Sequence, residues 1–298
     1  MSCANPVTIN VKGRAVQVGC RHCLNCRLEY QIALEFGVRH ELFDMYQRGL
    51  GACFCTLTYD DNHLPAHGSL CKKDLQNFFK LVRTNQKRKN PLPQWKYLAC
   101  GEYGDSFGRP HYHVLFLGLT DTLAHNFVVP YWEHGLTDCK VLKSGAIRYV
   151  LKYCTKTAMG TKAEELYDNQ NLERPFITHS KKLGYDWLLR NRDDIVAHNF
   201  CYMDKGIRKP LPAYWRRQFD LFDQFDPTPS IKKLSHEAKQ HGYPDYQSWS
   251  KQKTYNFERE MTAKVRESGI PVDDSSLIYE SGYVPFDVSL VKSVLSRS

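Results

Sequence analysis

Polar and apolar residues alternate with a period of two along residues 110–118, and this pattern predicts a β-strand. The two faces of that strand differ, one carrying His111, His113, Leu115 and Leu117 and the other carrying Tyr112, Val114 and Phe116. Residues 52–60, 95–104 and 134–143 are also rich in β-branched and aromatic residues and are bounded by turn-forming residues. Together these segments predict four strands.

Apolar residues at helical spacing predict three longer helices, over residues 27–47, 70–86 and 144–160. A shorter helix is expected between the third and fourth strands. The residues expected to weaken the first helix, cap the second and end the third are, in that order, Gly37, Ser69 and Gly160. The second helix has one apolar face, formed by Leu75, Phe78, Phe79 and Val82.

The order strand, helix, two strands, helix, strand, helix predicts an α+β fold, in which helices flank one face of a central antiparallel sheet. Residues 1–50 are expected to form a cysteine-rich knuckle and a helix packed on the core, and residues 51–215 the core itself. Residues 216–298 form a poorly defined C-terminal extension. Within that extension we expect a linker at residues 225–230 and partial helix around residues 256–267.

The composition favours a folded protein with a polyanionic partner. The chain has 298 residues, which is enough to bury a core, and its apolar content of 42% excludes wholesale disorder. The net charge of +9 is unevenly spread. Residues 71–100 contain eight Lys or Arg and one acidic residue, and the interval between Asp138 and Glu164 contains six basic residues and none acidic. Nucleic acid would suit such clusters, although solvated basic helix faces explain either run alone equally well.

The cysteines and the termini indicate the compartment. The cysteine count is odd at 11, in a chain too large to need disulfide staples. The first residues lack the apolar core of a secretion signal, and no segment reaches the roughly 20 apolar residues of a membrane span. We therefore expect a soluble protein of a reducing compartment, with no membrane partner.

Three of the cysteines have the spacing C-x-x-C-x-x-C, at Cys20, Cys23 and Cys26. Metal sites use this spacing, so these residues are candidate ligands of a structural zinc ion, given a fourth ligand such as His40. The sequence contains no second cysteine pair of the kind that completes many zinc sites. A reduced turn whose thiols pack as small apolar groups is the alternative.

Glu102, His111 and His113 form a candidate metal site. The two histidines share one face of the predicted strand, and Glu102 lies nine positions before His111, across the predicted turn on a neighbouring strand. Imidazole and carboxylate together suit divalent transition ions, and the carboxylate also accommodates magnesium. Taken alone, the H-x-H pair is explained equally well by two buried, hydrogen-bonded histidines.

Tyr149 and Tyr153 lie four residues apart in the third predicted helix, so they share a face and are separated by roughly 6 Å along its axis. Lys152 lies near the edge of that face and Lys156 continues it. Such an aromatic pair is commonly structural when it stands alone. Beside a bound cation, however, a phenol can attack a phosphodiester, and a neighbouring lysine would favour the phenolate.

Four motifs give the chain a resemblance to the HUH endonucleases. In chain order they are VGCRHCLNCRLE, FCTLTYDDNHLP, GEYGDSFGRPHYHVLF and YVLKYCTK. More narrowly, the chain resembles the replication initiation proteins of microviruses, small single-stranded DNA phages, and especially their gokushovirus branch. The likeness extends from about Val18 to Tyr214. Cys55 and Cys154 depart from the motifs, because apolar residues are more usual at both positions.

The resemblance implies a rolling-circle initiator with an HUH nuclease core. Magnesium or manganese would be held by Glu102, His111 and His113. Tyr149 and Tyr153 would alternate as nucleophiles, and Lys152 would assist proton transfer. The substrate implied is single-stranded DNA at a viral replication origin, which is nicked through a tyrosine–phosphodiester intermediate and later rejoined.

The resemblance also implies partners and a location. Because no G-x-x-x-x-G-K-[ST] motif occurs, unwinding is expected from a host helicase, and synthesis from a host polymerase, in the cytoplasm of the bacterial host cell. Within the nuclease class, the alternatives are a plasmid-type HUH initiator and a transposase, although two tyrosines disfavour a single-tyrosine transposase. Outside that class, the alternative is a non-catalytic zinc-knuckle protein that binds nucleic acid.

Overall fold

The computed structural model describes most of the chain, namely residues 3, 6–11, 13–88, 92–104, 108–143, 145–156, 160–204, 206–219, 228–246, 248, 249, 251, 252 and 256. The chain forms two compact units, one of residues 34–192 and one of residues 1–33 and 193–298. Helix α1 (Leu24–Gln47) contributes residues to both. The three-part division expected from the sequence stays a prediction.

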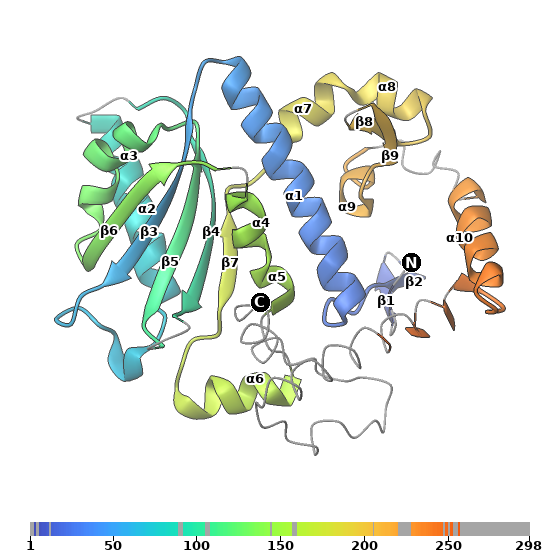
Figure 1. The fold of residues 1–298 in the computed structure, drawn as a ribbon, viewed down its shortest axis with the longest axis horizontal. Coiled ribbons are helices and arrows are strands. Elements are labelled where there is room, and N and C mark those ends of the chain that lie inside the picture. The colour runs from blue at the N-terminus through green and yellow to red at the C-terminus, as the bar shows by residue number, and fades with distance from the viewer. Residues whose placement is uncertain are drawn as a thin grey trace. The chain divides into compact units, whose positions relative to one another are not determined.

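The unit of residues 34–192 is built on a five-stranded antiparallel sheet, which confirms the predicted α+β fold (Figure 1). Its strands are β3 (Ala52–Tyr59), β4 (Lys96–Tyr103), β5 (Pro110–Leu117), β6 (Gly135–Val141) and β7 (Phe176–His179). They lie in the order β6-β3-β5-β4-β7. The first four strands confirm the predicted ones, whereas the sequence pattern did not reveal the short edge strand β7.

The helices of this unit confirm two of the predicted long helices and correct the third. Besides α1 they are η1 (Ala66–Gly68), α2 (Lys72–Arg88), α3 (Asp121–Phe127), η2 (Val129–Tyr131), α4 (Ala146–Leu151), α5 (Tyr153–Lys156), α6 (Gly160–Leu166), η3 (Asp168–Gln170) and α7 (Tyr185–Arg190). Ser69 is not the cap of α2, and its Oγ instead accepts a hydrogen bond from the Glu173 amide at 2.8 Å. The third predicted helix is divided at Lys152, and Gly160 begins a helix rather than ending one.

Helices cover both faces of the sheet, which corrects the expectation of helices on one face only. On one face, α2 and α3 pack on the strands through a buried core that includes Leu57, Phe78, Phe79, Tyr112 and Phe116. On the other face, α1, α4 and α5 pack on a core that includes Val38, Leu98, Leu115, Val150 and Leu151. Because side chains alternate along a strand, the second face also receives His111 and His113.

A close backbone approach explains why a glycine interrupts α1. Gly184, with φ +73°, precedes α7, and a Cβ added to it would lie 2.6 Å from the Gly37 carbonyl oxygen. The Gly184 amide also donates to the buried Glu41 carboxylate at 2.8 Å, which accepts a 2.7 Å bond from Lys96 Nζ. Gly37 therefore gives the segment before α7 access to the helix, and it does not break α1.

We expect Gly184→Ala to lower the free energy of unfolding by about 2–4 kcal/mol, since it adds a left-handed φ penalty to a backbone clash. Gly49→Ala is the matched control, because Gly49 has φ +71° but nothing within 4 Å of an added Cβ. The control should therefore cost only about 1 kcal/mol. Chemical denaturation of both variants measures the difference, and equal losses would contradict the close approach as the cause.

One pair of cysteines departs from the expectation that the thiols are reduced. Cys55 on β3 lies opposite Cys139 on β6 in the strand register, and the two form a disulfide. In the part of the chain that the structure describes, the other nine cysteines form none. Cys55, which departs from the family motif, therefore has a partner within the sheet.

The unit of residues 1–33 and 193–298 contains two hairpins and several helices. They are β1 (Val7–Val11), β2 (Arg14–Val18), α8 (Arg192–Ala197), β8 (Cys201–Asp204), β9 (Ile207–Pro210), α9 (Ala213–Arg216) and α10 (Thr228–Gln240). Helix α10 begins inside the predicted linker, so that linker is shorter than expected. The helix predicted around residues 256–267 lies outside the described residues, apart from residue 256. None of the described helices has both the length and the apolar character needed to cross a membrane.

Candidate active site

Strand register brings the three predicted metal ligands together. Glu102 on β4 lies directly opposite His111 on β5, and His113 projects from the same face two residues further on. Glu102 Oε1 is 3.1 Å from His111 Nε2 and 2.8 Å from His113 Nε2. The ligand atoms of the three residues lie within 4.8 Å of one another, and Glu102 and His113 are buried. We call these three residues the Glu–His–His group.

Each imidazole of the group is held through its other ring nitrogen. His111 Nδ1 lies 3.1 Å from the Arg109 carbonyl oxygen, and His113 Nδ1 lies 3.1 Å from Thr56 Oγ1. When the Nδ1 atoms carry the ring protons, they donate to these two oxygens, and both Nε2 lone pairs face Glu102. Histidines that bind metals are commonly oriented by a second contact of this kind.

Both tyrosines reach the Glu–His–His group. The hydroxyl of Tyr149, on α4, lies 3.1 Å from Glu102 Oε1 and 3.4 Å from His113 Nε2. The hydroxyl of Tyr153, at the start of α5, donates to that of Tyr149 at 3.5 Å. The two differ in access, because Tyr149 is 38% exposed and Tyr153 only 5%. The fold thus brings the predicted strand residues and the predicted helix residues to one place.

Lys152 lies at the break between α4 and α5, with its ammonium group over both tyrosine rings. Its Nζ is 3.8 Å from the centroid of the Tyr149 ring and 5.1 Å from that of Tyr153, which is a cation–π arrangement. Burial nevertheless raises the pKa of Tyr149 to about 12, and it raises the pKa of Tyr153 as well. Both phenols therefore hold their protons at neutral pH, contrary to the expectation that a neighbouring lysine favours the phenolate.

The protonation states of the Glu–His–His group suit cation binding. Burial alone would raise the pKa of the Glu102 carboxyl, but hydrogen bonds with His111, His113 and Tyr153 outweigh it and hold that pKa well below its usual range. Burial lowers the pKa of His113. An ionised carboxylate beside a neutral imidazole is the combination that coordinates a metal without first losing a proton.

Three supporting residues were not predicted. Thr56 and Arg109 supply the oxygens that face the imidazoles, and Phe54 stacks on the His113 ring with 5.1 Å between centroids. Thr56 belongs to the threonine-rich motif FCTLTYDDNHLP and pairs with His113 in the register of β3 and β5. The motif was therefore the available signal, but its relation to His113 depends on a strand pairing that the sequence does not state.

The class of protein follows from a match to the part of the chain that carries this site. Residues 52–158 match the family model described as Replication-associated protein ORF2. That interval runs from β3 through α5, and it contains the Glu–His–His group, both tyrosines and Lys152.

Two known phage proteins are similar over a longer stretch. The chain is 29% identical over 221 residues to Replication-associated protein VP4 of Bdellovibrio phage phiMH2K, a match that covers 66% of this chain and 65% of that protein. It is 28% identical over 224 residues to Replication-associated protein ORF2 of Spiroplasma virus 4, and this match covers 68% of each. No solved structure matches the chain. The predicted resemblance to phage replication proteins is confirmed.

Proposed function

We propose that this protein initiates phage DNA replication by nicking single-stranded DNA at a viral origin and later rejoining the displaced strand. The names of its relatives support a role in phage DNA replication. One observation carries the proposed chemistry: the Tyr149 hydroxyl lies 3.1 Å from Glu102 Oε1 and 3.4 Å from His113 Nε2. A nucleophile this close to a set of cation ligands can act on the same phosphate group that the cation binds.

The Glu–His–His group fits a magnesium or manganese ion. One carboxylate and two imidazoles suit such divalent ions. The contacts of the two Nδ1 atoms with Arg109 and Thr56 hold the rings with their Nε2 atoms toward Glu102. Glu102, His111 and His113 would hold the ion, which when bound would polarise the oxygens of the scissile phosphate.

Tyr149 is the proposed first nucleophile, because it is the more exposed tyrosine and contacts the Glu–His–His group directly. Its phenolic oxygen forms a bond to phosphorus while the bond from phosphorus to the 3′ oxygen breaks. The phenol gives up its proton, and the departing 3′ oxygen takes one up and leaves as a hydroxyl. One phosphodiester replaces another, so a later attack by a 3′-hydroxyl restores the DNA and the phenol without ATP.

Lys152 and Tyr153 have separate proposed roles. The Lys152 ammonium, over both rings, would offset the negative charge that develops on the phenolic oxygen and assist its proton transfer. After the first cleavage, Tyr149 stays joined to the 5′ end of the DNA, and Tyr153 would cut the regenerated origin. The 3.5 Å contact between the hydroxyls allows the two nucleophiles to alternate within one chain.

The proposed pathway depends on other proteins for strand separation and synthesis. We propose that a host helicase unwinds the DNA and a host polymerase extends the 3′-hydroxyl, in the cytoplasm of the bacterial host. The absence of a P-loop sequence motif supports this division of labour.

A nicking assay tests the proposal. Single-stranded DNA carrying a phage origin, labelled on the 5′ side or the 3′ side of the nick, is incubated with the protein and either manganese or a chelator. We expect cleavage only with the metal, with protein attached to the new 5′ end. Binding without cleavage under all conditions would favour the zinc-knuckle binding protein, and cleavage of a plasmid origin in place of the phage origin would favour a plasmid-type initiator.

Thr56→Val is expected to weaken manganese binding by about 10- to 100-fold, because it removes the hydroxyl that faces His113 Nδ1 while keeping the side-chain shape. Calorimetric titration measures the affinity. Thr178→Val is the matched control, since Thr178 lies on β7 opposite Ala99, on the other face of the sheet. Unchanged affinity in Thr56→Val would contradict a positioning role for this hydroxyl.

A further inference from the structure

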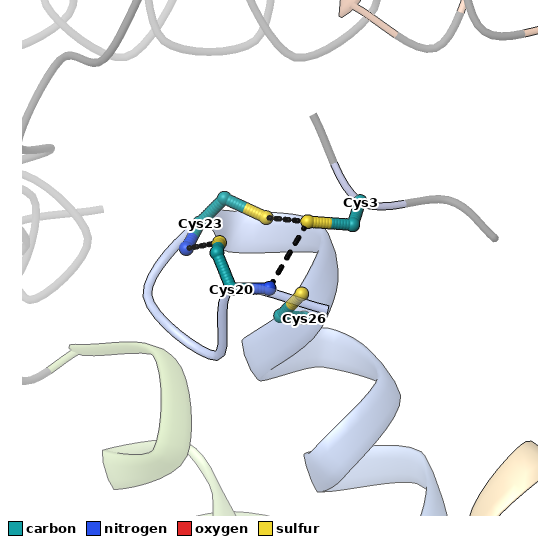
Figure 2. Close-up of side chains that lie close together, drawn as sticks. All are labelled: Cys3, Cys20, Cys23 and Cys26. Carbon is teal, nitrogen blue, oxygen red and sulfur yellow. Dashed lines mark hydrogen bonds between the residues drawn. The ribbon is translucent and has the colours of Figure 1, made fainter. Parts of the chain in front are cut away.

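We propose that Cys3, Cys20, Cys23 and Cys26 form a closed structural zinc site. The C-x-x-C-x-x-C spacing predicts three ligands and leaves the fourth open, with His40 as a candidate. In the structure the fourth sulfur comes from Cys3, 17 residues before Cys20 in the chain. We call these four residues the cysteine cluster. It lies in the unit of residues 1–33 and 193–298, at the start of α1 (Figure 2).

The sulfur atoms of the cysteine cluster lie close enough to bind one ion. All four lie within 4.8 Å of one another, and the sulfurs of Cys3 and Cys23 are 3.8 Å apart. A tetrahedral zinc ion with Zn–S bonds of about 2.3 Å requires sulfur–sulfur separations of about 3.8 Å. The four side chains therefore need only small movements to complete a tetrahedron.

The backbone around the cysteine cluster is shaped to hold thiolates. The Cys20 amide donates to Cys3 Sγ at 3.3 Å, and the Cys23 amide donates to Cys20 Sγ at the same distance, so two sulfurs receive N–H groups that stabilise negative charge (Figure 2). Arg21 has φ +64°, a conformation that costs a non-glycine residue about 1–3 kcal/mol and that the turn between these cysteines must offset. A Cβ on Gly19 would lie 2.8 Å from Cys26 Sγ, so glycine leaves room for that sulfur.

The donor set decides which metal each site takes. Four thiolates are soft ligands, and four of them in a tetrahedral arrangement select zinc or iron over magnesium and manganese. The Glu–His–His group offers oxygen and nitrogen donors and suits the harder ions. Four protein ligands also leave no open position for a substrate, which makes the cysteine cluster a structural site rather than a catalytic one.

A zinc ion would stabilise a part of the chain that has little apolar core. The four ligands come from the N-terminal segment, the end of the β1–β2 hairpin and the first turn of α1. A two-stranded hairpin is marginally stable by itself, and Val7 and Ile9 of this one are 49% and 41% exposed. Because metal binding of this kind supplies folding free energy, the ion would fix the hairpin to the helix.

Metal analysis of the full chain, purified under reducing conditions without added zinc, tests the site. We expect about one zinc per chain, and at least a tenfold loss of bound zinc in each of the four Cys→Ser variants. Cys71→Ser is the matched control, because Cys71 is half-buried outside the cysteine cluster. His40→Ala should also keep its zinc. Absence of zinc, iron in its place, or loss of zinc in His40→Ala but not in Cys3→Ser would overturn the proposal.

A second measurement separates loss of the ion from general misfolding. Cobalt exchanged into the wild-type protein should give the visible and near-ultraviolet absorption of a four-thiolate site, and Cys3→Ser should weaken that absorption. Manganese should still raise the melting temperature of Cys3→Ser through the Glu–His–His group, which shows that the sheet is folded. Wild-type protein without thiolate-to-cobalt absorption, or isolated under reducing conditions with a Cys3–Cys23 disulfide, would refute the zinc site. Neither measurement depends on nicking, so failure here leaves the proposed function standing.

Discussion

Replacing both Tyr149 and Tyr153 with Phe is expected to abolish the covalent protein–DNA adduct, with a loss of at least about 1,000-fold in its rate of formation. Phenylalanine keeps both aromatic rings, and therefore the packing of Tyr149 against Phe54 and the position of Lys152 over the rings. Only the two oxygens that can attack phosphorus are removed. Denaturing gels of labelled origin DNA, incubated with the protein and manganese, measure the adduct directly.

The single variants decide the order of attack. We expect Tyr149→Phe to lose most of the first cleavage, because this hydroxyl is the exposed one that contacts Glu102. Tyr153→Phe should keep the first cleavage and lose the second cleavage and the rejoining. Tyr131→Phe is the control, since Tyr131 packs against the core on the opposite face of the sheet. An adduct formed by the double variant would refute the nucleophile assignment, and full first cleavage by Tyr149→Phe would transfer the first attack to Tyr153.

The sequence predicted those parts of the fold and site that depend on short-range periodicity. Alternation along residues 110–117 placed His111 and His113 on one face, and the single turn between two strands placed Glu102 opposite them. A spacing of four residues placed Tyr149 and Tyr153 on one side of a helical segment. Strand and helix periods are local properties, so they can be read without knowledge of the tertiary structure.

Features that depend on contacts between distant segments could not be read in the same way. The roles of Thr56 and of the Cys55–Cys139 disulfide require the pairing of β3 with β5 and β6, which no local pattern specifies. Strand β7 has four residues, too few to show a clear alternation. Cys3 has no spacing that links it to Cys20, and the turn and the hairpin that bring them together are tertiary features. The protonated state of Tyr149 likewise reflects burial, which raises its pKa to about 12.

Glu102→Gln is expected to remove the response to manganese, with a fall in nicking rate of at least about 100-fold. The substitution keeps the size and hydrogen-bonding capacity of a side chain that is only 4% exposed, but it removes the negative charge of the Glu–His–His group. Wild-type protein at a manganese concentration of about 100 times its Kd should gain about 2.7 kcal/mol in unfolding free energy. The variant should show little or no gain at the same concentration, measured by denaturation with and without the metal.

Glu41→Gln supplies the control, because Glu41 is also a buried glutamate, 3% exposed, but binds Lys96 and the Gly184 amide instead of histidines. Breaking that buried pair should lower the free energy of unfolding by about 3 kcal/mol. Its manganese response should stay intact, since the loss lies in packing between α1 and the sheet and not in the ligand set. The two glutamates therefore separate stability from cation binding. If manganese stabilises Glu102→Gln as much as the wild type, the ion binds elsewhere, and the strand residues serve only to fill the core beside the tyrosines.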